Sequence, residues 1–539
     1  MPEITIDPTT RIEGHHATTL DVEDGVVQDA KSHMEMFRGV ELVTLERPPS
    51  AVPDLTGKVC GVCFTCHRLT SSRAVEDAAM AAGVFDGVPR NAVLLRDAME
   101  GIFYLWNHTI HLYALAGPDY SDAVAETGLT RLDPIEGDGY MEAMDHQRTL
   151  MKAFTEFGGR VPNSLTYVPG GMSADPDAST IQSIKDYVGT VSEWIGPTDA
   201  VPAVIENVRN GEFDPSLGSG LHDLVGMLYT AAEAGAAEYG VGPGRYYSNG
   251  VFRLPESEEF LFERGIYRDG SVEPKTKAEI LDGITESTAY SWYTADSAGH
   301  PAEAKPPEPA PEKDGAYSWG KAPRYEGQTM EVGPLARLVV SDLDPFDLRA
   351  ELGGGSAASS TLNRLIARTQ EILIVRDNVL KLLDAIEPGK PFTAEWDDDF
   401  DGKGVSLFEA SRGALSHWAD IRNGQINQYQ IITPTLWNMG PRDGDDTPGP
   451  LETALVGMEI TDVETPLDVM RTIRSMDPCL ACSVHLQTPA GEYETTLEPA
   501  TPGAVGEGTT NTCDNADSVV GSAGSNTTND RNDEITDER

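Results

Sequence analysis

Basic residues are scarce in this chain. Its 539 residues include 40 Lys and Arg against 87 Asp and Glu, which gives a formal net charge of −47 and a pI near 4.4. A surface of this charge repels phosphate groups, so the composition excludes binding to nucleic acid or to anionic lipid. The excess is larger than solubility requires, and it favours a protein adapted to high salt, where ions screen self-repulsion. An ordinary acidic protein is the alternative.

Cysteine is also rare, and long apolar runs are absent. Six cysteines in 539 residues exclude a disulfide scaffold. No apolar run reaches the roughly 18–20 residues that cross a bilayer, and Met1–Asp7 contains neither a basic region nor an apolar core. We therefore expect no transmembrane helix and no signal peptide in this chain, so that export or membrane association would depend on a partner.

Four of the six cysteines form two Cys-x-x-Cys pairs near opposite ends of the chain. The pairs, each with the histidine that follows it, are Cys60, Cys63 and His67, then Cys479, Cys482 and His485. Thiolates at this spacing can bind one soft metal ion, so the four could enclose a single centre. A structural zinc site is the alternative, although zinc ligands usually lie within one small module and closing so long a loop costs entropy. The spacing favours a functional metal centre without identifying the metal.

The cysteines lie within an ordered set of longer motifs. These are Arg11-Ile-Glu-Gly-His15, Phe37-Arg-Gly-Val-Glu41, Cys60–His67, His108-Thr-Ile-His111, Tyr317-Ser-Trp319, Met330-Glu-Val-Gly-Pro-Leu-Ala-Arg337, Arg412-Gly-Ala-Leu-Ser-His-Trp418, Pro434-Thr-Leu-Trp-Asn438 and Asp477–His485. With them the chain resembles the large, catalytic subunit of nickel–iron hydrogenases, especially the respiratory uptake group. Length alone would suggest three or four domains, but the resemblance implies one mainly helical α+β body with small peripheral antiparallel sheets.

The resemblance assigns the metal ligands. It implies that Cys60 and Cys479 bind nickel terminally, and that Cys63 and Cys482 bridge nickel to an iron carrying cyanide and carbon monoxide. It also implies a second cation, magnesium or iron, bound by Glu41, His485 and the backbone carbonyl of Ile431. Magnesium takes few protein ligands and keeps several waters, so this small set is chemically reasonable.

The resemblance also implies the catalytic residues. Arg412 would lie over the open metal face with Asp477 as its partner, Cys479 would act as the first base, and Glu13 would relay protons. A salt bridge from Glu13 to Arg11 is the alternative for that glutamate.

Two further side chains have roles implied by the resemblance, and two positions depart from its pattern. His67 would hydrogen-bond a bridging thiolate, and Thr435 would donate to a cyanide ligand. Ser411 stands where proline is usual, and Asn107 stands where uptake enzymes often have aspartate.

The implied function is the heterolytic oxidation of hydrogen, with electrons passed to an iron–sulfur small subunit and a respiratory chain. That subunit commonly carries a twin-arginine export signal, and a membrane cytochrome b would be reached through it. A maturation protease would cut between His485 and Leu486. The alternatives are a hydrogen-sensing regulatory subunit, a non-catalytic relative in an electron-transfer complex and a zinc-stabilised scaffold.

Hydrophobic periodicity gives the expected organisation. Residues 1–57 alternate like a small antiparallel sheet, and residues 58–485 form the helical body that carries both cysteine pairs. Within that body we expect helices over about 68–82, 91–115, 141–157 and 361–383, and an exposed Pro-rich loop over 300–315. Residues 486–539 have too few large apolar side chains to order, so we expect a disordered acidic extension. Cys66 should be a buried apolar side chain, and Cys513 a free thiol.

Overall fold

The computed structural model describes residues 3–37, 39–257 and 259–483, all within one unit of the chain, Met1–Gln487. Its α-helices are α1 (Val40–Thr44), α2 (Val52–Thr56), α3 (Cys66–Ala81), α4 (Arg90–Ile110), α5 (Asp122–Ala125), α6 (Asp138–Gly158), α7 (Ala178–Ile195), α8 (Val201–Asn210), α9 (Ser219–Glu233), α10 (Lys277–Gly283), α11 (Pro334–Val340), α12 (Leu348–Leu352), α13 (Thr361–Ala385), α14 (Pro434–Met439), α15 (Pro450–Leu455), α16 (Leu467–Ser475) and α17 (Leu480–Ser483). Its strands are β1 (Glu3–Ile6), β2 (His16–Glu23), β3 (Val26–Met34), β4 (Tyr167–Val168), β5 (Gly171–Met172), β6 (Tyr246–Arg253), β7 (Phe260–Arg268), β8 (Ser271–Pro274), β9 (Ile284–Ser287), β10 (Ala322–Tyr325), β11 (Gly402–Ala410), β12 (Gly413–Arg422) and β13 (Gln425–Ile432).

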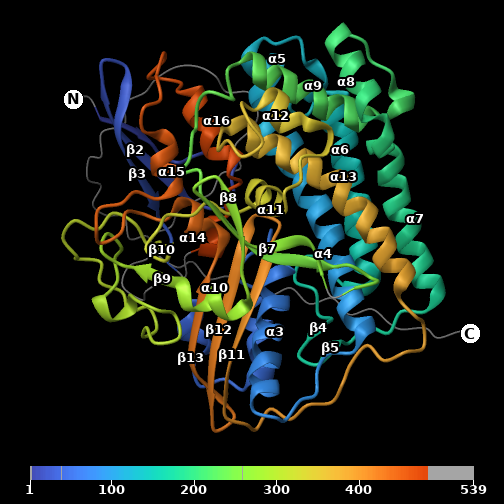
Figure 1. Cartoon of the computed structure of the whole chain (residues 1–539), viewed down its shortest axis with the longest axis vertical. Helices are drawn as coiled ribbons and strands as arrows, with labels where there is room; N and C mark the ends of the chain where they lie inside the picture. The colour runs from blue at the N-terminus through green and yellow to red at the C-terminus, as the bar shows by residue number, and fades with distance from the viewer. Residues whose placement is uncertain (1–2, 38, 258, 484–539) are drawn as a thin grey trace, which may run out of the picture. The chain divides into compact units, whose positions relative to one another are not determined.

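Long helices form one side of this unit (Figure 1). The helices α4 and α13 pack along each other and are buried around most of their circumference, so they are core helices. The helices α6, α7 and α9 pack around them. The helix α7 buries a single stripe, as expected for an outer helix, formed by Ile181, Ile184, Val188, Val191 and Ile195.

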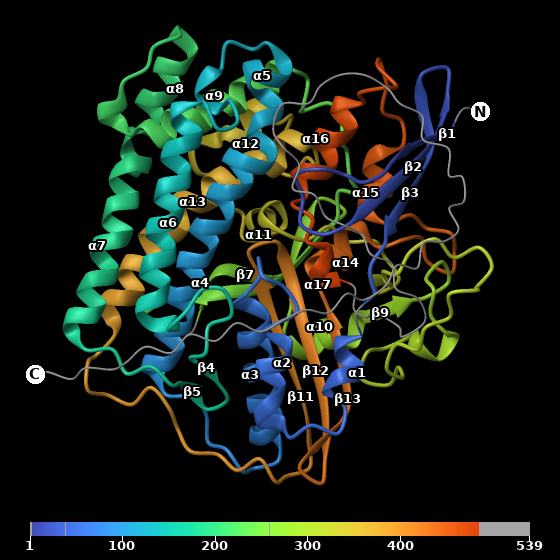
Figure 2. The same cartoon turned by 180° about the vertical axis from the view of Figure 1, so that it is seen from behind.

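Antiparallel sheets form the other side, and the strands β11, β12 and β13 pair in that order. The helix α3 lies against β11 and β12, as both views show (Figures 1 and 2). Gly404 makes this close approach possible, because a Cβ there would lie 2.2 Å from the backbone oxygen of Ala74. The packing places the N-terminal end of α3, which follows the first cysteine pair, beside the β11–β12 hairpin.

The four predicted helices are confirmed as α3, α4, α6 and α13, with ends within a few residues of the predicted ones. The predicted extension of α4 to residue 115 is present as a π-helical segment, His111–Ala116. The mainly helical α+β class is confirmed as well. No described helix is long and apolar enough to cross a bilayer.

The expected sheet over residues 1–57 requires a correction. The strands β1, β2 and β3 form an antiparallel sheet that ends at Met34, with a turn at Asp24 and Gly25 between β2 and β3. The helices α1 and α2 follow and pack against β13 and α3. The helices α1 and α2 are five residues long each. In so short a segment the pattern of apolar residues does not distinguish a helix from a strand.

The expected loop over residues 300–315 is present, but it is only partly exposed. It contains no helix or strand, but Ala304 and Pro307 are buried. The side chain of Gln430 on β13 donates to the backbone oxygen of Lys305 at 2.9 Å. The loop therefore covers the edge of the β11–β13 sheet, which a Pro-rich composition does not predict. The expected tail, residues 486–539 with Cys513, lies outside the described residues.

Candidate metal centre

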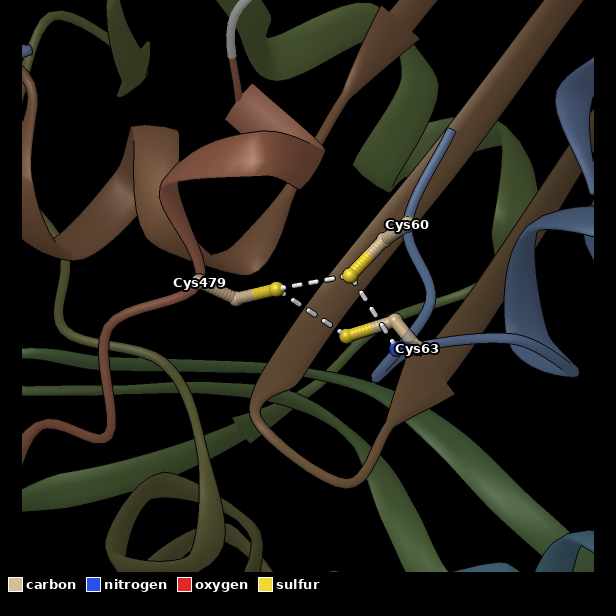
Figure 3. A group of neighbouring side chains, drawn as sticks. All are labelled: Cys60, Cys63 and Cys479. Atoms are coloured by element: carbon tan, nitrogen blue, oxygen red, sulfur yellow. Dashed lines mark hydrogen bonds between the residues drawn. The ribbon is translucent and has the colours of Figure 1, made fainter. Parts of the chain in front are cut away.

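Three cysteine sulfur atoms meet in the interior, from the two predicted pairs (Figure 3). The Sγ atom of Cys479 lies 3.3 Å from the Sγ atoms of both Cys60 and Cys63. All three side chains are buried. The backbone N–H groups of Val62 and Cys63 each donate to Cys60 Sγ at 3.2 Å, which fixes the position of this sulfur atom.

This donor set fits a soft metal, because clustered thiolates repel one another unless a cation lies between them. The backbone of Cys482 lies in α17, three residues after Cys479, whereas its side chain lies outside the described residues. Cys66 is buried as predicted, and it is not a member of the three-sulfur group.

Arg412 extends from the turn between β11 and β12 to this cluster. Its Nη1 donates to Cys63 Sγ at 3.2 Å, its Nε donates to the Asp477 backbone oxygen at 3.0 Å, and its Nη2 pairs with Asp477 Oδ1 at 3.0 Å. Burial disfavours ionisation of Asp477, but the charges of Arg412, His111 and Arg368 together with the Asn107 hydrogen bond outweigh it and hold the Asp477 pKa below its usual range. Asn107 donates its side-chain amide to Asp477 Oδ2 at 2.9 Å. The guanidinium is therefore fixed at three points.

Behind the cluster, Arg337 holds the turn that carries Arg412. It is fully buried, and it donates to the backbone oxygens of Ala410 and Ser411 at 2.9 Å each. Glu371 and Glu409 balance its charge with ion pairs of 2.7 and 2.9 Å. Sequence reasoning included Arg337 in a motif but assigned it no role. Its two backbone acceptors lie more than seventy positions further along the chain, so no pattern near Arg337 in the sequence indicates these hydrogen bonds.

Glu13 joins the N-terminal segment to the second cysteine pair. Its Oε2 accepts from Cys479 Sγ at 3.2 Å and from the Ala481 N–H at 3.0 Å, and its backbone oxygen accepts from Leu480 N–H at 2.8 Å. Burial raises the pKa of Glu13, although these hydrogen bonds oppose the shift. Arg11 pairs with Asp119 instead, so the alternative salt bridge between Glu13 and Arg11 is wrong.

Thr435 contacts a residue of the cluster, whereas the contact of His67 is with a second histidine. The Nδ1 of His67 is 3.1 Å from Nε2 of His417, which in turn contacts the Tyr429 hydroxyl at 2.8 Å. The Thr435 hydroxyl accepts from the Cys479 N–H at 3.1 Å, so it fixes the backbone of a cluster residue.

The residues predicted to bind the second cation meet only in part. Glu41 and Ile431 line a small cavity, and the backbone of Ile431 hydrogen-bonds the Glu41 carboxylate. Burial raises the Glu41 pKa to about 7. Sequence reasoning missed Glu286, which lines the same cavity and pairs with Lys321 at 3.0 Å. His485 lies outside the described residues.

Comparison with known proteins identifies the family. A family model described as nickel-dependent hydrogenase matches residues 38–134 and 135–485, and a model described as HoxL-like matches residues 3–37. The chain belongs to the nickel-dependent hydrogenase family. It is thus a hydrogenase large, catalytic subunit, an oxidoreductase of the kind that pairs with a small subunit.

Relatives from several bacteria support this assignment over nearly the whole chain. The periplasmic [NiFeSe] hydrogenase large subunit of Desulfomicrobium baculatum is 33% identical over 524 residues, which covers 90% of this chain and 95% of the relative. The uptake hydrogenase large subunit of Bradyrhizobium diazoefficiens is 30% identical, covering 91% and 96%. The Ni-Fe-Se hydrogenase structure of D. vulgaris Hildenborough in the reduced state is 30% identical with a TM-score of 0.77, covering 90% of this chain and 100% of that one. The nickel–iron hydrogenase fold is therefore confirmed.

Proposed function

We propose that this hydrogenase subunit oxidises hydrogen to protons and electrons, and that the electrons pass through an iron–sulfur small subunit to a respiratory chain. The proposal rests on one observation. The sulfur atoms of Cys60, Cys63 and Cys479 meet beside the fixed Arg412 guanidinium. Thiolates bind a soft metal, and a preorganised cation next to it can stabilise charge that develops during turnover. The similarity to an uptake hydrogenase supports the oxidation direction.

A nickel–iron centre supplies the heterolytic splitting of hydrogen when it is bound. We propose Cys60 and Cys479 as terminal nickel ligands, and Cys63 and Cys482 as bridges to an iron that carries cyanide and carbon monoxide. The soft sulfur donors support this assignment, because thiolates favour nickel and iron over hard cations such as magnesium. The Thr435 hydroxyl, which accepts from the Cys479 N–H, retains its own proton to donate to a cyanide.

The protein's part in turnover is to hold and move the proton. Cys479 is the proposed first base, and Glu13 Oε2 lies 3.2 Å from its sulfur, within reach of direct transfer. The raised pKa of Glu13 lets this carboxyl hold a proton closer to neutral pH than an exposed glutamate does. Asp477 keeps Arg412 in place, and His67 would hydrogen-bond a bridging thiolate.

A second cation, magnesium or iron, is proposed at Glu41, His485 and the Ile431 backbone carbonyl. The burial of the Glu41 carboxylate on this cavity supports a cation there, because a nearby positive charge would stabilise the ionised carboxylate. Glu286 adds a second carboxylate to the cavity.

Metal analysis and infrared spectroscopy test the proposed centre. The purified subunit with its partner should contain about one nickel and one iron at the cluster, with infrared bands from metal-bound cyanide and carbon monoxide. Stoichiometric zinc without those bands would support the zinc-stabilised scaffold. Intact bands with hydrogen turnover near zero would favour the hydrogen-sensing subunit, and absent metals would favour a non-catalytic relative.

We propose that the C-terminal extension, residues 486–539, is removed by proteolysis during maturation. A maturation protease would cut between His485 and Leu486, since a ligand at residue 485 must reach a buried cation while 54 more residues would have to leave the same site. Intact-mass measurement of active enzyme should give a chain ending at His485. An active chain that still ends at Arg539 refutes processing.

We further propose that the assembly is a heterodimer from a halophile, associated with the membrane through partner subunits. A twin-arginine signal on the small subunit would export both chains, and a membrane cytochrome b would accept the electrons. The net charge of −47 supports high-salt adaptation. Activity should fall as the salt concentration is lowered, and full activity in dilute buffer would contradict the halophilic origin.

A further inference from the structure

A cavity of about 510 Å³ lies between α3, α4, the β6–β7 hairpin and β11, and none of the described residues that line it is a cysteine. This volume is within the range of small-molecule sites, roughly 300–1,000 Å³. The four elements that surround it can be followed in Figure 1. Phe252 on its wall has a φ of 59°, a left-handed backbone conformation that is strained in a residue other than glycine. Strained residues of this kind are concentrated at ligand sites.

The charge of the lining is the reverse of the charge of the chain. Among the described residues that line the cavity, six are basic and three are acidic, whereas the whole chain has 40 basic and 87 acidic residues. The basic ones are Arg73, Arg90, Arg96, Arg253, Arg264 and Lys277, and the acidic ones are Glu76, Asp77 and Asp97. A positive concavity on an acidic protein concentrates anions at one place.

Ion pairs within the lining engage three of these cations. Arg96 pairs with Glu76 at 2.7 Å, Lys277 pairs with Asp77 at 2.6 Å, and Asp97 pairs with Arg73 at 3.0 Å. All three lining carboxylates are thus engaged. Arg264 and Arg90 have no carboxylate partner among the described residues, so positive charge remains at the cavity.

Arg264 lies at the centre of this remaining charge. Its Nε donates to the Asn249 backbone oxygen at 2.7 Å, which fixes the side chain. This hydrogen bond does not use the two terminal nitrogens of the guanidinium. Its guanidinium carbon lies 5.2 Å from the Phe260 ring centroid, and that of Arg253 lies 5.7 Å from the same centroid. Burial lowers the pKa of Arg264, and the neighbouring Arg253 charge lowers it further. Two guanidiniums held on one ring repel each other, and a bound anion would relieve that repulsion.

Most of the remaining lining is apolar, apart from Ser257 and Ser406. Val93, Leu94, Val251 and Leu407 line the cavity together with the Phe260 ring. A bare inorganic anion would leave this surface unused, whereas an aromatic or aliphatic body would cover it. We propose that this cavity binds a small organic anion, whose phosphate or carboxylate group pairs with Arg264 and whose apolar body packs on Phe260.

Calorimetric titration of the full-length protein tests the site, with phenyl phosphate as the probe and with inorganic phosphate and phenol as its separated parts. Phenyl phosphate should bind more tightly than either part. Arg264→Gln should weaken its binding roughly ten- to hundredfold, because a charge-assisted hydrogen bond is lost. Phe260→Ala should weaken phenyl phosphate more than inorganic phosphate.

Arg268→Gln is the matched control, because Arg268 is on the same strand, pairs with Glu273 and Glu326, and does not line the cavity. It should leave the affinity unchanged, and the melting temperature of each variant shows whether it is folded. Equal losses in folded Arg264→Gln and Arg268→Gln would overturn the assignment. So would an absence of phenyl phosphate binding, or inorganic phosphate binding as tightly as phenyl phosphate. Hydrogen turnover is not part of this readout, so failure here leaves the proposed function intact.

Discussion

Replacing Cys479 with serine is expected to remove nickel from the subunit and to reduce hydrogen turnover below detection. Its sulfur is the common neighbour of Cys60 and Cys63, at 3.3 Å from each. A serine hydroxyl is a hard donor that stays protonated near neutral pH, so it cannot supply the soft anionic ligand that the cluster needs. The same change removes the thiol that contacts Glu13. Metal analysis and dye-coupled hydrogen oxidation of the purified heterodimer measure both effects.

Cys66→Ser is the control for this substitution. Cys66 is equally buried, is the first residue of α3 close after Cys63, and lies outside the three-sulfur group. Its serine can retain a contact to the Cys63 backbone oxygen, which the thiol approaches at 3.5 Å. Nickel should be retained in this variant. Full nickel occupancy in Cys479→Ser, or equal nickel loss in both variants, would remove Cys479 from the ligand set.

Arg412→Lys is expected to keep the metals and to lower the rate of hydrogen oxidation by about 10²–10³, the usual cost of removing one preorganised electrostatic group. The guanidinium makes contacts with Cys63 Sγ and with two oxygens of Asp477 at the same time. A lysine ammonium is a single point on a flexible stem, so it cannot reproduce this planar arrangement. The change should therefore appear in the turnover number, with the infrared bands of the centre still present.

Arg324→Lys separates this effect from a general loss of buried arginine. Arg324 is as buried as Arg412, pairs with Asp443 at 2.7 Å and donates to the Thr447 backbone oxygen at 2.8 Å, but it makes no contact with the cluster. It should lower the melting temperature and leave the turnover number near that of the unmodified enzyme. Near-normal turnover in Arg412→Lys would exclude the guanidinium from the reaction.

Much of the fold was predictable because its signals are local. The helices α4 and α13 have apolar residues at helical period over more than five turns, so the sequence predicts both within a few residues. The turn between β2 and β3 was predictable from its Asp-Gly pair. The short helices α1 and α2 and the buried positions of the Pro-rich loop were not predictable, because a few residues of ambiguous pattern adopt the conformation that lets them pack against their neighbours.

The sequence by itself determined the chemistry of the centre. The two cysteine pairs, Arg412 and Asp477 are of the residue types that a soft metal and a charged site require, and their motifs identified the family. Only the tertiary structure decided which side chains meet. Glu13 contacts Cys479 across 466 positions, and Arg11 pairs with Asp119 in preference to its near neighbour Glu13. Such partners depend on how distant segments pack, and the free energy of that packing is summed over the whole core, so no local pattern encodes it.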